Sequence, residues 1–172
     1  MQTLDVPQAN DLDTVRAVVH AAWRGAGNLD AIADFTGFSR RHTHYRAHAA
    51  RILGLLRVEE DEVFLTPLGE RLVGTDPHTD KERMVLGQAV EQSPVMQVLA
   101  PDLLGREPPS IDDLAERLFQ ECKLSTTTAR RRANGLLAWR RRVLGHALKG
   151  WPEPAPAEPA KPKTKGEQLS LF

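Results

Sequence analysis

This sequence has little cysteine, no excess of charge of either sign and no long hydrophobic run. Cys122 is the only cysteine among 172 residues, which excludes an intramolecular disulfide framework and a cysteine-rich zinc site within one chain. Lysine plus arginine and aspartate plus glutamate number 23 each, so the basic composition typical of many nucleic-acid-binding proteins is missing. No apolar stretch approaches the roughly 20 residues that span a bilayer.

Recognisable targeting and catalytic motifs are also missing. The N-terminal residues 1–13 lack the basic and apolar regions of a secretory signal. No glycine-rich phosphate loop, H-E-x-x-H or G-x-S-x-G motif occurs. His42, His44 and His48 lie close together and the last two are one helical turn apart, but no Cys, Asp or Glu ligand lies near them in sequence. The sequence therefore predicts a cytoplasmic protein that is not an enzyme and has no cofactor, no metal site and no membrane partner.

The first half of the chain predicts helices interrupted by one hairpin. Apolar spacing indicates helices at 12–23 and 29–36, and Ser39 is a suitable N-cap for a third helix that runs to about residue 53. Two short apolar strands flank the polar residues 59–62, as in a β-hairpin. Thr66 and Pro67 then open another helix. This order is typical of a winged helix-turn-helix domain, which we assign to residues 8–76.

The second half predicts helices only. After helical stretches at 81–92 and 94–99, Ser110 is a suitable N-cap for the next helix. A turn at 122–124 precedes Ser125, which caps a long helix to about residue 144. A helix, a tight turn and a long basic helix form a second helix-turn-helix, so residues 77–150 are predicted to be a second domain.

The composition changes at residue 151. Five of the 12 prolines lie beyond this point, and proline at that density opposes both helix and sheet. We interpret residues 151–167 as an extended linker and residues 168–172 as a peptide with apolar anchors. The predicted fold class is therefore mainly α, with tandem helix-turn-helix domains, one small β-hairpin wing and a disordered C-terminal tail.

The positive charge is concentrated where helix-turn-helix proteins contact DNA. Residues 1–76 carry a net charge of −3 and residues 77–150 a net charge of +3. No acidic residue lies between Asp34 and Glu59 or between Glu121 and Glu153, and both predicted recognition helices fall inside these stretches. This segregation indicates DNA binding by at least one of the two helices.

Helical geometry divides each recognition helix into an inner and an outer face. In the first helix, Tyr45, Ala49 and Ile52 fall on the predicted core face, whereas Thr43 and Ala47 fall on the opposite face. Arginine, threonine and asparagine are residue types that contact phosphates and base edges. The predicted DNA-binding residues are Arg40, Arg41, Thr43, His44, Arg51, Thr127, Arg130, Arg131, Arg132, Asn134 and Arg142.

The tip of the predicted hairpin is acidic at all four positions from Glu59 to Glu62. Phosphates would repel this charge, so the wing is not expected to clamp DNA. It faces a partner instead, or the second domain dominates binding.

Most of residues 12–144 resembles a bacterial two-part winged-helix family that is found beside restriction nucleases and other defence proteins. The stretches that carry the resemblance are GFSRRHTHYRAHAARILGLL (37–56), FLTPLGERL (64–72) and STTTARRRANGLLAW (125–139). The resemblance implies a DNA-handling role, with a nuclease or repair protein as a partner. Any cutting activity would belong to that partner.

The last five residues, QLSLF, are similar to the consensus peptide by which bacterial proteins bind the β sliding clamp. The resemblance implies that Gln168 enters a small polar site, that Leu169 approaches a shallow apolar patch and that Leu171 and Phe172 fill the main hydrophobic pocket. Ser170 completes the motif. An extended tether with apolar anchors suits this kind of short-motif recognition.

Together these features predict a DNA-binding adaptor tethered to the sliding clamp, close to the nucleoid, in replication-associated repair, damage response or defence. One alternative is a dimeric transcriptional regulator that binds an operator tightly, and a homodimer is left open. Another is a protein-interaction adaptor in which the acidic wing and the tail each hold a partner and DNA is not bound.

Overall fold

The computed structural model describes residues 5–145, which are mainly α-helical with one antiparallel hairpin. The predicted linker (151–167) and the predicted clamp peptide (168–172) lie outside the described residues. No helix in the described part is long and apolar enough to cross a membrane. The helices are α1 (Leu12–Trp23), α2 (Leu29–Thr36), α3 (Arg40–Ile52), α4 (Pro67–Val73), α5 (Asp80–Gln92), α6 (Pro94–Leu99), α7 (Ile111–Cys122) and α8 (Thr126–Leu144).

The helix starts follow from local hydrogen bonding. Ser39, Thr66, Ser110 and Ser125 were predicted as N-caps, and each side chain accepts a hydrogen bond from the backbone N–H of the residue three positions later. Such caps satisfy amides that have no partner within the helix. At the C-terminal end of α2, Gly37 adopts a left-handed conformation with φ of 76°, as expected for a glycine C-cap.

The hairpin consists of β1 (Leu56–Glu59) and β2 (Glu62–Leu65). Leu56 pairs with Leu65 and Glu59 pairs with Glu62. The predicted four-residue tip is therefore wrong by one position on each side, because both glutamates belong to the ladder and only residues 60–61 form the turn. The backbone N–H of Leu29 donates to the carbonyl oxygen of Asp61 at 3.1 Å, which attaches the turn to the start of α2.

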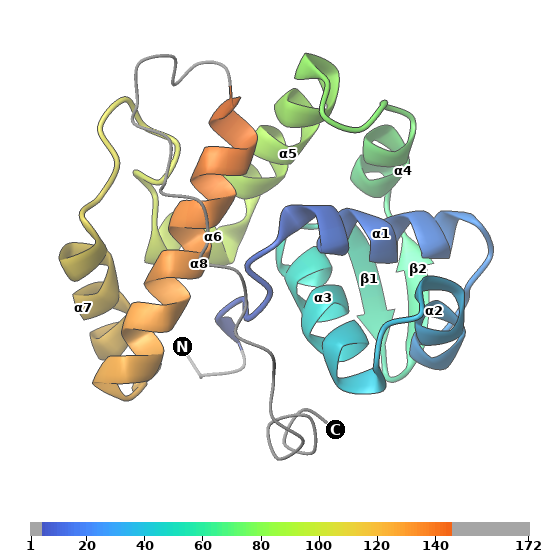
Figure 1. Ribbon diagram of the computed structural model, residues 1–172, viewed down its shortest axis with the longest axis horizontal. Helices are drawn as coiled ribbons and strands as arrows, with labels where there is room; N and C mark the ends of the chain where they lie inside the picture. Colours follow the sequence, from blue (N-terminus) through green and yellow to red (C-terminus); the bar gives the residue numbers. More distant parts are fainter. Residues whose placement is uncertain (1–4, 146–172) are drawn as a thin grey trace, which may run out of the picture.

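The elements form two sides joined by α4 and α5. The first side consists of α1, α2, α3 and the hairpin, the second of α6, α7 and α8, and α4 and α5 extend across one end (Figure 1). The predicted boundary at residue 76 falls in the loop between α4 and α5. One contiguous cluster of buried apolar side chains includes residues from both predicted domains, such as Val15, Leu53, Leu86, Leu118 and Trp139.

A buried carboxylate also joins the two sides. The side chain of Glu82 on α5 has no exposed surface, and its Oε2 lies 3.0 Å from Nη1 of Arg16 on α1. Its Oε1 accepts hydrogen bonds from the backbone N–H of His78, at 3.0 Å, and from Arg142 on α8. A buried charge must be paired in this way, because an unpaired one costs several kcal/mol. Glu82 thus connects α1, α5 and α8.

Helix α3 is buried on more than one side, which the sequence pattern did not predict. It packs against α1, α2 and β1, whereas the prediction assumed a single buried stripe. Thr43 and Ala47, expected on the outer face, are 0% and 2% exposed. The Thr43 hydroxyl donates to the Ser39 carbonyl oxygen at 2.9 Å, which satisfies this polar group in the interior. The placement of Thr43 and Ala47 on the outer face is therefore wrong.

Candidate nucleic-acid interface

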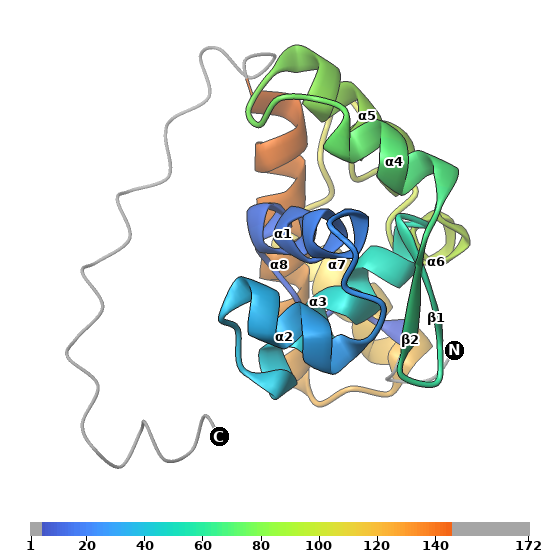
Figure 2. The same cartoon turned by 90° about the vertical axis from the view of Figure 1, so that its right-hand side faces the viewer.

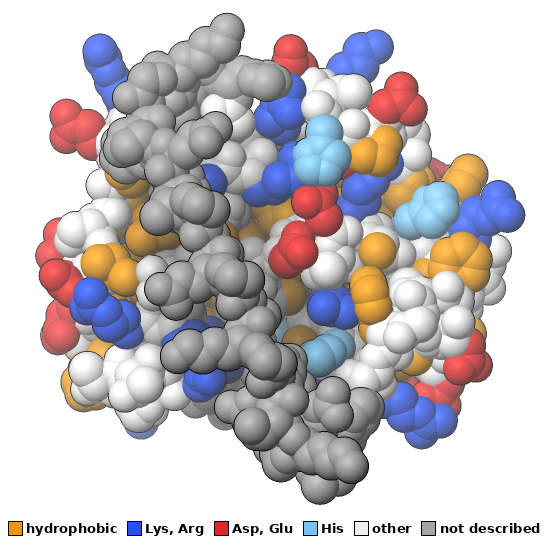
Figure 3. Space-filling view, in the orientation of Figure 1, with side chains coloured by type: hydrophobic (Ala, Val, Ile, Leu, Met, Phe, Trp, Pro, Cys, Tyr) orange, Lys and Arg blue, Asp and Glu red, His pale blue; other side chains and the backbone are white. Residues whose placement is uncertain are grey.

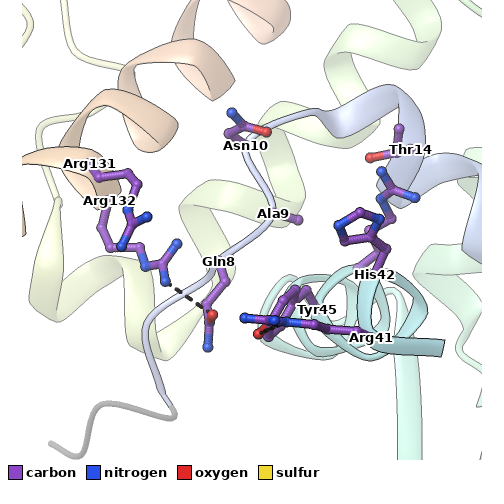
Figure 4. Close-up of a pocket in the computed structure, with 10 residues that line it drawn as sticks. Gln8, Ala9, Asn10, Thr14, Arg41, His42, Tyr45, Arg131 and Arg132 are labelled. Atoms are coloured by element: carbon purple, nitrogen blue, oxygen red, sulfur yellow. Dashed lines mark hydrogen bonds between the residues drawn. The ribbon is translucent and has the colours of Figure 1, made fainter. Parts of the chain in front are cut away.

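A pocket of about 360 Å³ lies between α3, α8 and the segment that precedes α1. Four arginines line it, and no aspartate or glutamate does. The close-up shows side chains from α3 on one side and from α8 on the other, with residues 8–10 between them (Figure 4). The lining residues are Gln8, Ala9, Asn10, Thr14, Arg41, His42, Tyr45, Arg46, Arg131 and Arg132. We call this feature the basic pocket.

The segment at 8–10 is held in place by α8. The indole nitrogen of Trp139 donates to the carbonyl oxygen of Ala9 at 3.0 Å. Gly135 faces Asn10, and a Cβ atom at Gly135 would lie 3.3 Å from the Asn10 Cβ. A residue without a side chain at this point lets the segment lie close to the helix backbone. One wall of the pocket therefore depends on contacts between residues about 125 positions apart.

The α8 wall carries two arginines with different environments. Arg131 is exposed and makes no hydrogen bond or ion pair with another described residue. Arg132 is half-buried, and its Nη2 donates to Oε1 of Gln8 at 3.0 Å. Burial, followed by repulsion from Arg131, lowers the pKa of Arg132, because both disfavour its charged form. An anion in the pocket would relieve this repulsion.

The two arginines of the α3 wall each lie near an aromatic ring. The Nε of Arg41 donates to the Tyr45 hydroxyl at 2.8 Å, and the Arg41 guanidinium lies 5.5 Å from the centre of the Tyr45 ring. The Arg46 guanidinium lies 3.9 Å from the centre of the Phe38 ring, a favourable cation–π distance. Burial lowers the pKa of Arg46, and the charge of Asp11 partly opposes this effect.

Three of the predicted DNA-binding residues meet in the basic pocket: Arg41, Arg131 and Arg132. Others lie elsewhere on the surface. His44, Thr127 and Asn134 are exposed outside the pocket lining, and Arg51 contacts His48 at 3.1 Å. Two arginines are partly neutralised by acidic side chains, Arg40 by Asp30 at 3.2 Å and Arg130 by Asp112 at 2.6 Å.

Arg142 was predicted on the outer face of α8, and this placement is wrong. Its guanidinium lies 2.9 Å from Oδ1 of Asp13 and also contacts the buried Glu82. Burial opposes the charged form, but the hydrogen bonds to Asp13 and Glu82 outweigh burial and raise the pKa of Arg142. Arg140 is also buried, and it donates to the carbonyl oxygens of Leu103 and Gly105 at 2.6 Å each. Both arginines have structural partners within the protein.

Sequence reasoning missed several residues of the basic pocket. Arg46 belongs to the acid-free stretch that was recognised, but Tyr45 was assigned to the core face. Tyr45 is half-buried and lines the pocket. Gln8 and Asn10 lie in irregular backbone before α1, where no periodicity or motif could have indicated them. Their place in the pocket depends on the contact with α8.

The basic pocket is a local concentration of positive charge. On the face seen in Figure 3, basic, acidic and histidine side chains are interspersed among hydrophobic ones. The acidic turn of the hairpin does not line the basic pocket. Among the described residues no group of three or more His, Cys, Asp or Glu side chains is placed to hold a metal ion.

Comparison with known proteins gives a family and no described function. No curated protein and no solved structure matches the chain significantly. One family model, described as Domain of unknown function (DUF7226), matches residues 25–147. The match begins after α1 and includes α2 to α8, so it contains the arginines of the basic pocket but not residues 8–10. The chain therefore belongs to the DUF7226 family.

Proposed function

We propose that this protein binds DNA and that the basic pocket is the centre of the binding surface. The observation that carries the proposal is the meeting of α3 and α8 at a pocket with four arginines and no acidic side chain. These are the two helices in which the sequence concentrates positive charge without acidic residues. Phosphate contacts by arginine supply much of the affinity of DNA-binding proteins.

The arrangement of elements supports a helix-turn-helix assignment for both sides. The order α1, α2, α3, β1, β2, α4 is that of a winged helix-turn-helix, with α3 as the recognition helix. On the other side, α7 and α8 are joined by a three-residue turn in which Lys123 has a φ of 52°. We assign α8 as the recognition helix of this second unit.

The wing does not take part in the proposed interface. In both ribbon views α3 lies between the hairpin and α8 (Figures 1 and 2). Its turn is acidic, and the Arg57 Nε lies 3.3 Å from Glu59, which balances part of the local charge. The proposed contact with DNA therefore runs from α3 across residues 8–10 to α8.

A second part of the proposal is a tether to the β sliding clamp through Gln168, Leu169, Ser170, Leu171 and Phe172. It rests on the sequence resemblance, since these residues lie outside the described part of the chain. A tether raises the effective concentration of the protein at DNA, so that modest intrinsic affinity for DNA is sufficient. A sliding clamp encircles DNA, which makes the two binding functions compatible.

Binding to a fluorescein-labelled duplex, measured by anisotropy at several salt concentrations, tests the first part. Arg131→Ala is the most informative variant, because Arg131 is exposed and has no hydrogen-bond or ion-pair partner among the described residues. We expect weaker binding and a salt dependence reduced by about one released counterion. Arg71→Ala on α4, outside the pocket, removes the same charge and is the control. Equal behaviour of both variants would reject the basic pocket as the interface.

Interferometry against purified β clamp tests the second part. The full chain and a chain that ends at Glu167 are compared. Micromolar binding that disappears on truncation is the expected result. If the intact chain does not bind, the resemblance of the last five residues is a coincidence. The operator-binding regulator then becomes the hypothesis to test.

A further inference from the structure

We infer that the basic pocket takes one unpaired nucleotide of a DNA strand, with its phosphate at Arg131 and Arg132 and its base against Tyr45. This inference rests on the proposed function and specifies the DNA that the site recognises. It concerns the shape and the chemistry of the pocket rather than its charge alone.

The size of the pocket favours a single nucleotide over a duplex. Its volume of about 360 Å³ lies at the lower end of the range of small-ligand sites. Residues 8–10 cross between α3 and α8 and form part of the lining (Figure 4). A double helix would rest on the rim, whereas one nucleotide of a single strand can enter. Only an unstacked base is free to do so.

The α8 wall supplies the groups that bind the phosphate. Arg131 and Arg132 are adjacent, and the repulsion between them is not balanced by a carboxylate in the lining. The Arg132 guanidinium is held toward the pocket by Gln8 at 3.0 Å, so its position is fixed before a ligand binds. Guanidinium groups match phosphate oxygens with two hydrogen bonds each. This wall can therefore bind a phosphodiester or a terminal phosphate.

The opposite wall supplies the ring that stacks on the base. Two aromatic rings line the pocket, the phenol of Tyr45 and the imidazole of His42. The hydrogen bond from Arg41 to the Tyr45 hydroxyl restrains the phenol ring. Bases stack on such rings in proteins that bind single strands, with little dependence on base identity. The side-chain amides of Gln8 and Asn10 lie between the walls, and an amide can both donate to and accept from a base edge.

The test uses the full chain with three probes, a labelled oligothymidylate, a duplex of equal length and unlabelled thymidine 5′-monophosphate. We expect the single strand to bind about tenfold more tightly than the duplex. Thymidine monophosphate should displace the single strand at concentrations where inorganic phosphate, at matched ionic strength, does not. This competition requires no variant and is therefore independent of effects on folding.

Two substitutions of Tyr45 test whether its ring stacks on the base. Tyr45→Phe retains a stacking surface and should keep the preference for the single strand. Tyr45→Ala should lose about tenfold in affinity for the single strand, a larger loss than for the duplex, because only an unstacked base contacts the ring. Thermal unfolding followed by circular dichroism establishes that each variant is folded at the assay temperature.

The outcomes separate this inference from the proposed function. Equal affinity for both DNA forms, or equal competition by phosphate and thymidine monophosphate, would overturn the nucleotide pocket and leave DNA binding intact. Loss of duplex and single-strand binding alike in Tyr45→Ala would also overturn it. If the wild-type chain binds neither DNA form, the proposed function itself fails.

Discussion

The indole nitrogen of Trp139 donates a 3.0 Å hydrogen bond to the backbone carbonyl oxygen of Ala9, across 130 positions of the chain. Trp139 is fully buried in the hydrophobic core, and Ala9 lines the basic pocket. One contact thus connects the interior of the protein to the wall of its proposed binding site.

Trp139→Phe tests this contact. The substitution keeps an aromatic ring in the core but removes the donor, so the Ala9 carbonyl loses its partner. We expect the free energy of unfolding, measured by urea titration with circular dichroism, to fall by about 1–3 kcal/mol. Trp23→Phe is the matched control, because Trp23 is half exposed, and it should change the free energy by less than about 0.5 kcal/mol. Similar losses in both variants would show that the contact with Ala9 contributes nothing.

The pair formed by Glu82 and Arg142 predicts non-additive effects. Removing either partner leaves the other with one remaining ion pair, Arg16 for Glu82 and Asp13 for Arg142. Glu82→Ala and Arg142→Ala should therefore each cost about 1.5–3 kcal/mol in unfolding free energy, the typical value of hydrogen bonds to charged groups. The double variant should cost clearly less than the sum of the two. Urea titrations of the four proteins form the complete cycle. Additive losses would indicate that the two side chains do not interact in solution.

The Arg142→Ala variant also tests whether Arg142 faces the interior. Arg142→Ala should lower stability, while DNA affinity per folded molecule stays close to that of the wild type. A large loss of DNA affinity at unchanged stability would return Arg142 to the binding surface and contradict its ion pairs with Asp13 and Glu82.

Gly69 allows α4 to pack closely against Leu55, the residue before β1, and against Leu65 at the end of β2. A Cβ atom at this position would lie 2.2 Å from the Leu55 carbonyl oxygen and 2.9 Å from a Leu65 methyl group. Gly69→Ala should therefore destabilise the protein by about 1–3 kcal/mol or more. Gly74→Ala is the control in the same region. A Cβ atom at Gly74 would lie 3.4 Å from its nearest neighbour, the Glu70 carbonyl oxygen, and the φ of Gly74 is −74°. Differential scanning fluorimetry should show a much lower Tm for Gly69→Ala only.

The ion pair between Asp102 and Arg117 predicts a pH dependence of stability. Two hydrogen bonds, of 2.7 and 2.9 Å, join the carboxylate to the guanidinium. The hydrogen bonds from Arg117 lower the pKa of Asp102 below its usual value of 3.8. Because the folded-state pKa is the lower one, the pair stabilises the protein above about pH 4 and loses this effect as pH falls through the folded-state value.

Asp102→Asn removes the titrating group. Urea titrations between about pH 5 and about pH 2.5 should show a steeper loss of stability in the wild type than in Asp102→Asn. Parallel curves would mean that the pair does not change the protonation of Asp102 on folding. The effect should be modest, because both side chains are about 40% exposed.

Local sequence determined most of the secondary structure. The helix starts at Ser39, Thr66, Ser110 and Ser125 depend on a side chain and a backbone amide within three residues of each other. Such interactions are present in the linear sequence and need no distant partner. The mainly helical fold with one hairpin follows from these caps and from apolar periodicity, and the structure confirms it.

Tertiary structure decided which side chains form the candidate site. Thr43 became buried because α3 packs on several sides, and Arg142 turned inward because Glu82 requires a buried partner. Tyr45 and Gln8 joined the basic pocket because residues 8–10 are held against α8 by contacts across more than 120 positions. Sequence determined where the positive charge lies along the chain, since charge is a property of each residue. Only packing decided which arginines face each other across a pocket, because burial and pairing depend on neighbours that are distant in sequence.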